Sequence, residues 1–124
     1  MPLLHTLKAD ACRGLIGFEV VDCSRQAVGT LCSLWAEQGA GRVQFLGVHT
    51  AATAGRGLLV PAEGVQVDPA HRSIRLRCPA ALVHAAPAYA SSAELTPERK
   101  GEIYLHYDVH ATLQPRLSTL CRQA

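Results

Sequence analysis

The chain has 124 residues, which suits one domain with a single core and is too short for two domains of ordinary size. Hydrophobic residues make up 48% and charged residues 18%, a balance that is typical of globular chains and excludes a disordered one. The formal net charge of +2 is too small to indicate a nucleic acid or an acidic membrane as a partner.

The first half of the chain predicts three strands. Residues 17–22 (GFEVVD) are rich in β-branched side chains and end at a polar run, which indicates a strand and a turn. Residues 28–37 predict a second strand with apolar side chains on both faces. Alternation places Val28, Thr30, Cys32 and Leu34 on one face and Leu31, Ser33 and Trp35 on the other. A glycine turn follows, and residues 42–48 (RVQFLGV) predict the third strand.

The middle of the chain predicts a loop, a short strand and a hairpin. Residues 49–57 form the loop, and the following LLV strand is stopped by Pro61. Residues 64–78 predict a hairpin with a four-residue loop and one dry face. Its apolar phase contains Val65, Val67, Ile74 and Leu76, and its polar phase contains Gln66, Arg75 and Arg77. The corner from Pro61 to Gly64 lets the chain leave one edge of a sheet and re-enter at another, as closure of a small barrel requires.

The last third of the chain favours helix. The Ala-rich residues 79–89 predict a helical turn that ends before Pro87. Thr96 and Pro97 form an N-cap and a first helical residue, so we favour a short helix over residues 97–110. The alternation of apolar and polar side chains in that segment also permits a strand. The tail has leucines at 113, 117 and 120, which fit a docked helix or a stripe that faces a partner.

The cysteines and the apolar runs of the sequence indicate the cellular compartment of the protein. The five cysteines are an odd number without close spacing, so a disulfide framework is not expected. The first residues, MPLLHTLKADACRG, have a lysine after a brief apolar patch, so we expect no signal peptide. No window approaches the roughly 20 apolar residues of a membrane span. We expect a cytoplasmic protein whose contact with a membrane is at most peripheral.

The order of the parts resembles the PRC-barrel domain. The resemblance lies in IGFEVVD, a turn, AVGTLCSLW, a glycine turn, GRVQFLGV, and then GLLVPAEGVQVD, SIRL and APAY. This family is named after the cytoplasmic domain of the photosynthetic reaction-centre H subunit and includes a domain of a ribosome maturation factor. Such domains often have a glycine in the first turn, where this chain has Ser24, Arg25 and Gln26, so we expect that turn to differ in shape.

The resemblance implies a fold and a class of function. It implies an all-β or mainly β protein, a small, mostly antiparallel barrel with a short C-terminal helical extension. The barrel domain would span residues 14–89, after an N-terminal segment (1–13) and before a C-terminal extension (90–124). It further implies a protein-interaction or assembly role, with no catalytic residue and no cofactor to carry over.

The sequence gives little support for a metal site, a catalytic nucleophile or an anion site. His106 and His110 could share a metal ion on a helix but would lie about 13 Å apart on a strand, and ordinary surface histidines are the better interpretation, so no metal is expected. Cys23 and Cys78 lack an adjacent histidine and fit buried structural thiols. The residues that could contact an anion or RNA are Arg56, Arg75 and Arg77, although exposed strand arginines more often only solubilise an edge.

Apolar residues in both phases of two strands point to an interface. A small barrel has little interior, so we expect some of these residues to meet a second copy or a partner. The candidate interface residues are Leu31, Trp35, Phe45, Leu46, Leu117 and Leu120. The leading hypothesis is a non-enzymatic module that binds another protein, as a homodimer. The alternative is an RNA-processing or ribosome-assembly accessory with a continuous basic face through Arg75 and Arg77, although nucleic acid is the less expected partner.

Overall fold

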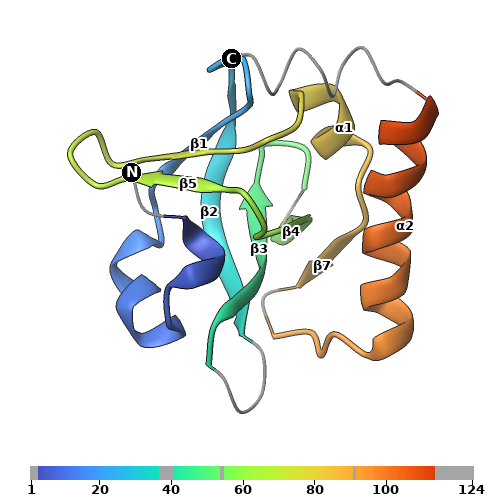
Figure 1. Cartoon of the computed structure of the whole chain (residues 1–124), viewed down its shortest axis with the longest axis horizontal. Coiled ribbons are helices and arrows are strands. Elements are labelled where there is room, and N and C mark those ends of the chain that lie inside the picture. Colours follow the sequence, from blue (N-terminus) through green and yellow to red (C-terminus); the bar gives the residue numbers. More distant parts are fainter. Residues whose placement is uncertain (1–2, 37–40, 54, 91, 114–124) are drawn as a thin grey trace.

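The computed structural model describes residues 3–36, 41–53, 55–90 and 92–113, which fold into a curled, half-barrel sheet with helices around it (Figure 1). The strands are β1 (Glu19–Val21), β2 (Ala27–Ala36), β3 (Val43–His49), β4 (Arg56–Pro61), β5 (Gln66–Asp68), β6 (Ser73–Arg75) and β7 (Ala88–Ala90). The helices are the 3-10 helices η1 (Leu4–Thr6) and η2 (Ala9–Leu15) and the α-helices α1 (Ala80–His84) and α2 (Pro97–Leu113).

The sheet runs in the order β5-β6-β1-β2-β3-β4-β7, and all neighbours are antiparallel except β1 and β6. This confirms the prediction of a mainly β, mostly antiparallel barrel-like fold with a short C-terminal helix. The predicted corner is also confirmed. The chain leaves β4 at Pro61 and re-enters as β5 at the far end of the strand order, through Gly64 with a φ of +76°. Such a positive φ is one that glycine adopts without steric cost.

The concave face of the sheet holds the main core. The predicted dry face of the β5–β6 hairpin is confirmed, because Val65, Val67, Ile74 and Leu76 are all buried. The N-terminal segment completes the same core, since Leu4 and Cys12 are fully buried in it. The Leu4 N–H donates to the Val65 carbonyl at 2.8 Å and so fixes this segment to the corner before β5.

A bulge changes the faces of β2. Leu31 pairs with Val48 and Leu34 pairs with Leu46, but the register shifts between Leu31 and Ser33. The extra residue in a bulge reverses the alternation beyond it. Leu31 and Leu34, predicted on opposite faces, therefore pack in one core.

The convex face of the sheet is apolar too, and α2 covers it. Phe45 and Leu59 are fully buried there against Leu95 and Ile103, in a second core. The prediction that Leu31, Phe45 and Leu46 lie on an uncovered face is therefore wrong. Leu31 and Leu46 fill the concave core, and Phe45 lies under the chain's own helix.

The helix prediction for residues 97–110 is confirmed, and the strand alternative is wrong. The Thr96 hydroxyl accepts the Arg99 N–H at 3.3 Å, which caps α2 at the predicted residue. The predicted helical turn before Pro87 is α1. The strand β7 was not predicted, because an Ala-rich segment has low β-propensity and β7 depends on pairing with β4.

A side-chain hydrogen bond that replaces a missing backbone bond anchors α2 to the sheet. The Leu59 N–H donates to the Pro87 carbonyl at 3.0 Å, but proline has no N–H to return to the Leu59 carbonyl. The Tyr107 hydroxyl from α2 donates to that carbonyl instead, at 2.7 Å. Burial raises the pKa of Tyr107, so the phenol keeps its proton and stays a donor.

We expect Tyr107→Phe to lower the free energy of unfolding by about 1–3 kcal/mol, because it leaves the buried Leu59 carbonyl without a donor. Urea denaturation measures this change. Tyr104→Phe is the matched control on the same helix, since no hydroxyl hydrogen bond of Tyr104 is seen among the described residues, and it should change stability by less than about 0.5 kcal/mol. Equal effects of the two substitutions would contradict the proposed anchor.

Candidate functional site

The three candidate arginines do not form one basic patch. The Arg75 guanidinium donates to the Cys23 carbonyl at 2.8 Å, and the stem of the exposed Arg77 lies against Gly64. Arg56 begins β4, and three strands separate β4 from the β6 strand that carries Arg75. Arg75 is therefore engaged in a structural hydrogen bond, and Arg56 lies apart from Arg75 and Arg77.

Of the two candidate metal ligands, His106 and His110, the structure describes only the side chain of His106, which makes a structural hydrogen bond. The ring of His106 contacts the Leu82 carbonyl through Nε2 at 2.8 Å, and because a carbonyl only accepts, Nε2 is the donor. This bond joins α2 to α1. The side chain of His110 lies outside the described residues. Within the described part of the chain, no three His, Cys, Asp or Glu side chains gather closely enough to hold a metal ion.

Burial protects two of the described free thiols, Cys12 and Cys78, from ionisation. Cys12, Cys32 and Cys78 are free, whereas Cys23 is disulfide-bonded, so the expectation of a structural thiol at Cys23 is wrong. Burial, together with the negative charge of Asp22, raises the pKa of Cys78 to about 12. Burial also raises the pKa of Cys12. Because the thiolate is the nucleophile, neither Cys12 nor Cys78 is activated at neutral pH.

A buried carboxylate, Asp22, organises the turn between β1 and β2. One of its oxygens accepts the N–H groups of Ser24 (2.9 Å) and Gln26 (2.8 Å). The other accepts the Ala80 N–H at 3.0 Å and so joins the turn to the start of α1. Sequence reasoning did not single out Asp22, although an aspartate before a polar turn is a known turn signal.

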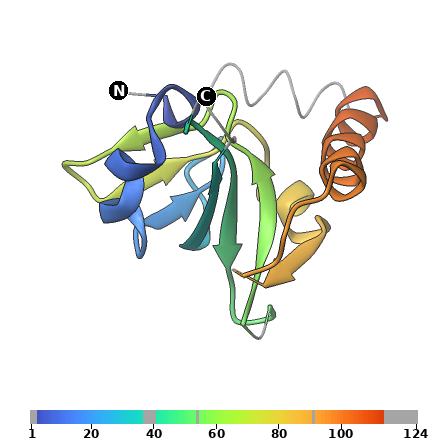
Figure 2. The ribbon, with the colours of Figure 1, turned by 90° about the horizontal axis from the view of Figure 1, so that it is seen from below.

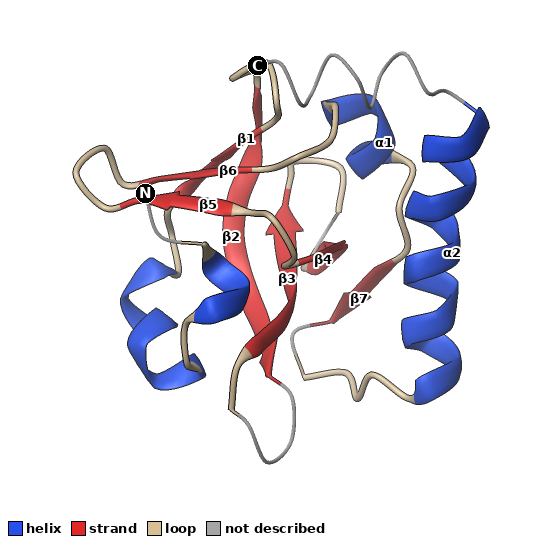
Figure 3. Ribbon diagram, in the orientation of Figure 1, coloured by secondary structure: helices blue, strands red, loops and turns tan. Residues whose placement is uncertain are grey.

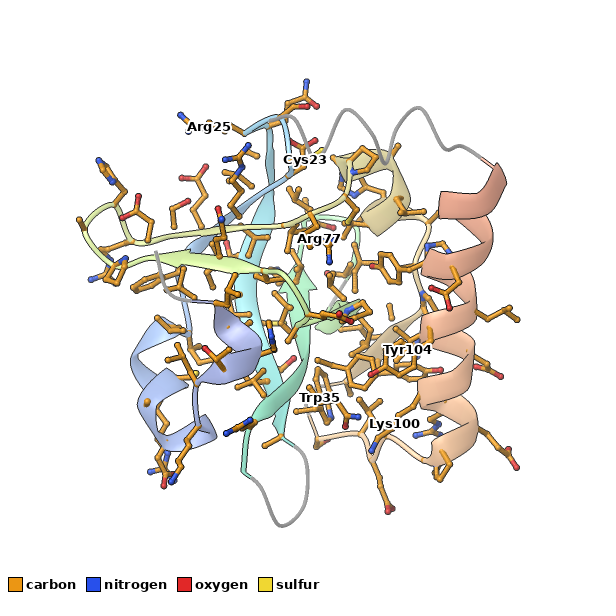
Figure 4. All side chains as sticks on the ribbon, in the orientation of Figure 1. Cys23, Arg25, Trp35, Arg77, Lys100 and Tyr104 are labelled. Atoms are coloured by element: carbon orange, nitrogen blue, oxygen red, sulfur yellow. The ribbon has the colours of Figure 1, made fainter. Side chains whose placement is uncertain are left out.

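Arg25 gives that turn the shape that a glycine would allow. Its φ is +67°, in the left-handed region, and its side chain projects away from the body of the protein (Figure 4). Arg25 therefore adopts a glycine-like conformation despite its side chain, and a different shape of this turn from that of other family members stays a prediction.

The remaining interface candidates differ in their placement. Trp35 is half-buried on the α2 side of the sheet, and its indole N–H donates to the Ala93 carbonyl at 3.0 Å (Figure 4). Leu117 and Leu120 lie outside the described residues. Leu105, which strand alternation would group with the buried Ile103, is instead 61% exposed, because a helix turns it away from the sheet.

The strand β7 is the last in the order of the sheet, next to β4 (Figure 3), and no further strand pairs with it among the described residues. Hydrogen-bonded pairs alternate along an antiparallel ladder, and Leu59 bonds to Pro87, so the next bonded pair is Gly57 with Tyr89. The peptide groups of Ala88 and Ala90 therefore point away from β4. Within the described residues, no partner is seen for the N–H and C=O of Ala88 or for the N–H of Ala90.

The opposite edge of the sheet is covered. Leu3 bridges to Gln66 of β5 in antiparallel fashion, beside the bond from Leu4 to Val65. The two ends of one sheet thus differ, because the N-terminal segment caps β5 while β7 keeps backbone donors and an acceptor. Unpaired edges of this kind are templates for a further strand. We take the β7 edge as the candidate functional site; sequence reasoning missed it because it missed β7.

The central side chain of β7 is held in place by α2. The Tyr89 hydroxyl donates to the Glu102 carboxylate at 3.3 Å, and the Arg99 guanidinium lies over the ring, 5.3 Å from its centroid. Partial burial and the charge of Glu102 raise the pKa of Tyr89, so the phenol remains a donor. The edge is therefore a fixed strand with small residues on either side of one aromatic ring.

We expect Asp22→Ala to lower the free energy of unfolding by about 2–4 kcal/mol, because three backbone N–H groups lose their acceptor. Chemical denaturation measures the loss. Ser24→Ala in the same turn removes an exposed hydroxyl and should cost less than about 0.5 kcal/mol. If both variants were equally stable, the carboxylate would not organise the turn.

We expect Arg25→Gly to leave stability unchanged or to raise it by up to about 1 kcal/mol, because glycine removes the strain of a left-handed side-chain-bearing residue. Gln26→Gly, one residue later and without a positive φ, should instead lose about 0.5–1 kcal/mol. Thermal unfolding of both variants makes the comparison. A loss for Arg25→Gly as large as that for Gln26→Gly would contradict the left-handed conformation.

Comparison with known families fits this architecture. None of the described helices is long and apolar enough to cross a bilayer. Curated proteins give no match to the chain. The family model of the PRC-barrel domain matches residues 8–81, which is more than half of the sequence. The match covers the strands β1 to β6 and the corner between Pro61 and Gly64. The chain belongs to the PRC-barrel family.

Proposed function

We propose that this PRC-barrel protein is a non-enzymatic, cytoplasmic interaction module that acts by binding another protein, and that it forms a homodimer. The observation that carries the proposal is the open edge of β7, which offers backbone donors and an acceptor beside a fixed tyrosine. Proteins commonly bind extended partners by adding a strand to such an edge.

The groups that could perform chemistry support a role without catalysis. The Asp22 carboxylate is occupied by three backbone N–H groups, and His106 is bonded to the Leu82 carbonyl. The pKa of the Cys78 thiol, at about 12, keeps it protonated. General acids, bases and nucleophiles must be free to react with a substrate, whereas Asp22 and His106 are held in structural hydrogen bonds and the Cys78 thiol stays protonated.

The RNA-processing or ribosome-assembly alternative needs a continuous basic face through Arg75 and Arg77. Arg75 is half-buried and bonded to the Cys23 carbonyl, which leaves Arg77 as the exposed member of the pair. A single free guanidinium supplies little phosphate contact, and phosphate contacts provide most of the affinity for RNA. A protein partner is therefore the better supported function.

Light scattering of the purified protein from micromolar to millimolar concentration tests the proposal. We expect the mass to rise from that of one chain towards that of two. A mass that stays at one chain throughout would contradict the homodimer. RNA binding measured at low and moderate salt tests the alternative, and binding that weakens steeply with salt would favour the alternative over a protein-binding role.

A further inference from the structure

We propose that the partner at the β7 edge is a second copy of the chain, and that two β7 strands pair antiparallel about a two-fold axis at Tyr89. This dimer rests on the proposed function and specifies its contact. It joins two half-barrels into one continuous sheet.

The first support is the arrangement of donors and acceptors. The N–H and C=O groups of Ala88 and Ala90 point away from β4 in the plane of the sheet, while those of Tyr89 bond to Gly57. An axis at Tyr89 places Ala88 opposite Ala90 of the second copy. Each such pair exchanges two N–H to C=O bonds, so the symmetric contact makes four. The Ala90 carbonyl already accepts the Ala93 N–H at 2.9 Å and uses its second lone pair here.

The register at Tyr89 is the favoured one. An axis at Ala88 would make only two bonds between the two copies of Ala88, and it would place Ala90 opposite Ala86. The Ala86 N–H is already bonded to the Val83 carbonyl at 3.0 Å, in the turn that follows α1. Of these two registers, the one centred on Tyr89 pairs every open group of Ala88 and Ala90 within β7 itself, which makes the edge complementary to itself.

The second support is access to the edge. The side chains of Ala88 and Ala90 are single methyl groups, so another backbone can approach closely. After β7 the chain turns and passes across the convex face, where Ala93 accepts the Trp35 indole N–H. The helix α2 lies over that same face (Figure 2). The linker and α2 therefore leave the outer edge of β7 uncovered among the described residues.

The third support is the pair of Tyr89 rings. In the proposed register the two Tyr89 residues form a pair without mutual backbone bonds, the closer kind of antiparallel pair. Cross-strand aromatic pairs stabilise a sheet. Glu102 and Arg99 already orient each ring, so little further ordering is needed. Because the edge has only three residues, we expect a weak, concentration-dependent dimer.

Ala90→Pro tests the backbone pairing directly. Proline removes the outward N–H of residue 90 but leaves the ladder between Tyr89 and Gly57, and such a proline is tolerated at an edge. We expect the dimer dissociation constant, measured by light scattering or sedimentation, to rise at least about tenfold. Ala90→Val keeps the N–H and is the matched control, which should dimerise like the wild type.

Tyr89→Cys tests the register independently. The two residues at position 89 would have Cα atoms about 4.5 Å apart, within the range for a disulfide. Mild oxidation should give a covalent dimer on a non-reducing gel. Wild type controls for the native cysteines, and Ala90→Cys, which faces position 88, should not link to itself. Circular dichroism checks that each variant is folded.

The outcomes separate this dimer from the broader function. If the wild type dimerises but Ala90→Pro dimerises equally well, or Tyr89→Cys does not cross-link, the β7 contact is wrong while a homodimer stands. If the wild type stays a monomer at every concentration, the proposed homodimer and its β7 contact both fail.

Discussion

The structure depends on one constraint, which is that the central strands of the sheet are apolar on both faces. Leu46 and Val60 point into the concave core, while their neighbours Phe45 and Leu59 point to the convex side. Each buried side chain of this size contributes roughly 1.5–3 kcal/mol relative to an exposed one, so neither face can be left in water. The curl of the sheet and the N-terminal segment cover the first face, and α2 covers the second. A barrel of this size therefore needs a helix outside it as well as a core inside it.

The same constraint explains how the C-terminal part of the chain is attached. β7 extends the sheet beside β4, and Pro87 at its start leaves the Leu59 carbonyl without a backbone donor. An unpaired carbonyl in a dry interface is costly, and the Tyr107 hydroxyl supplies the missing bond. One proline thus converts a gap in the ladder into a specific anchor for the helix that the convex face requires. His106 adds a second anchor at α1, and Trp35 holds the linker that leads to α2.

Local patterns predicted the parts of the fold that are encoded locally. The β5–β6 hairpin, the corner at Pro61 and the helix start at Thr96 follow from alternation, turn residues and capping, which act over a few positions. The bulge after Leu31 and the strand β7 depend on partners elsewhere in the sheet, so alternation misplaced the former and missed the latter. The error about Phe45 has the same origin: periodicity shows that a face is apolar but not what covers it. The family was recognisable from the order of its segments, whereas Asp22 and the β7 edge became visible only once the hydrogen bonds were known.

A site made of backbone groups accounts for the lack of any motif in this sequence. A site made of side chains has residue types at a spacing that can be recognised in a sequence. An open strand edge has no such motif, since every residue except proline carries the same backbone donor and acceptor. What distinguishes β7 is its position: the N-terminal segment protects β5, and nothing in the described residues does the same for β7. Long apolar edges invite aggregation, and proteins limit that risk by keeping edges short. Three residues with a fixed tyrosine at their centre are short enough to avoid uncontrolled pairing and symmetric enough to favour one defined pair.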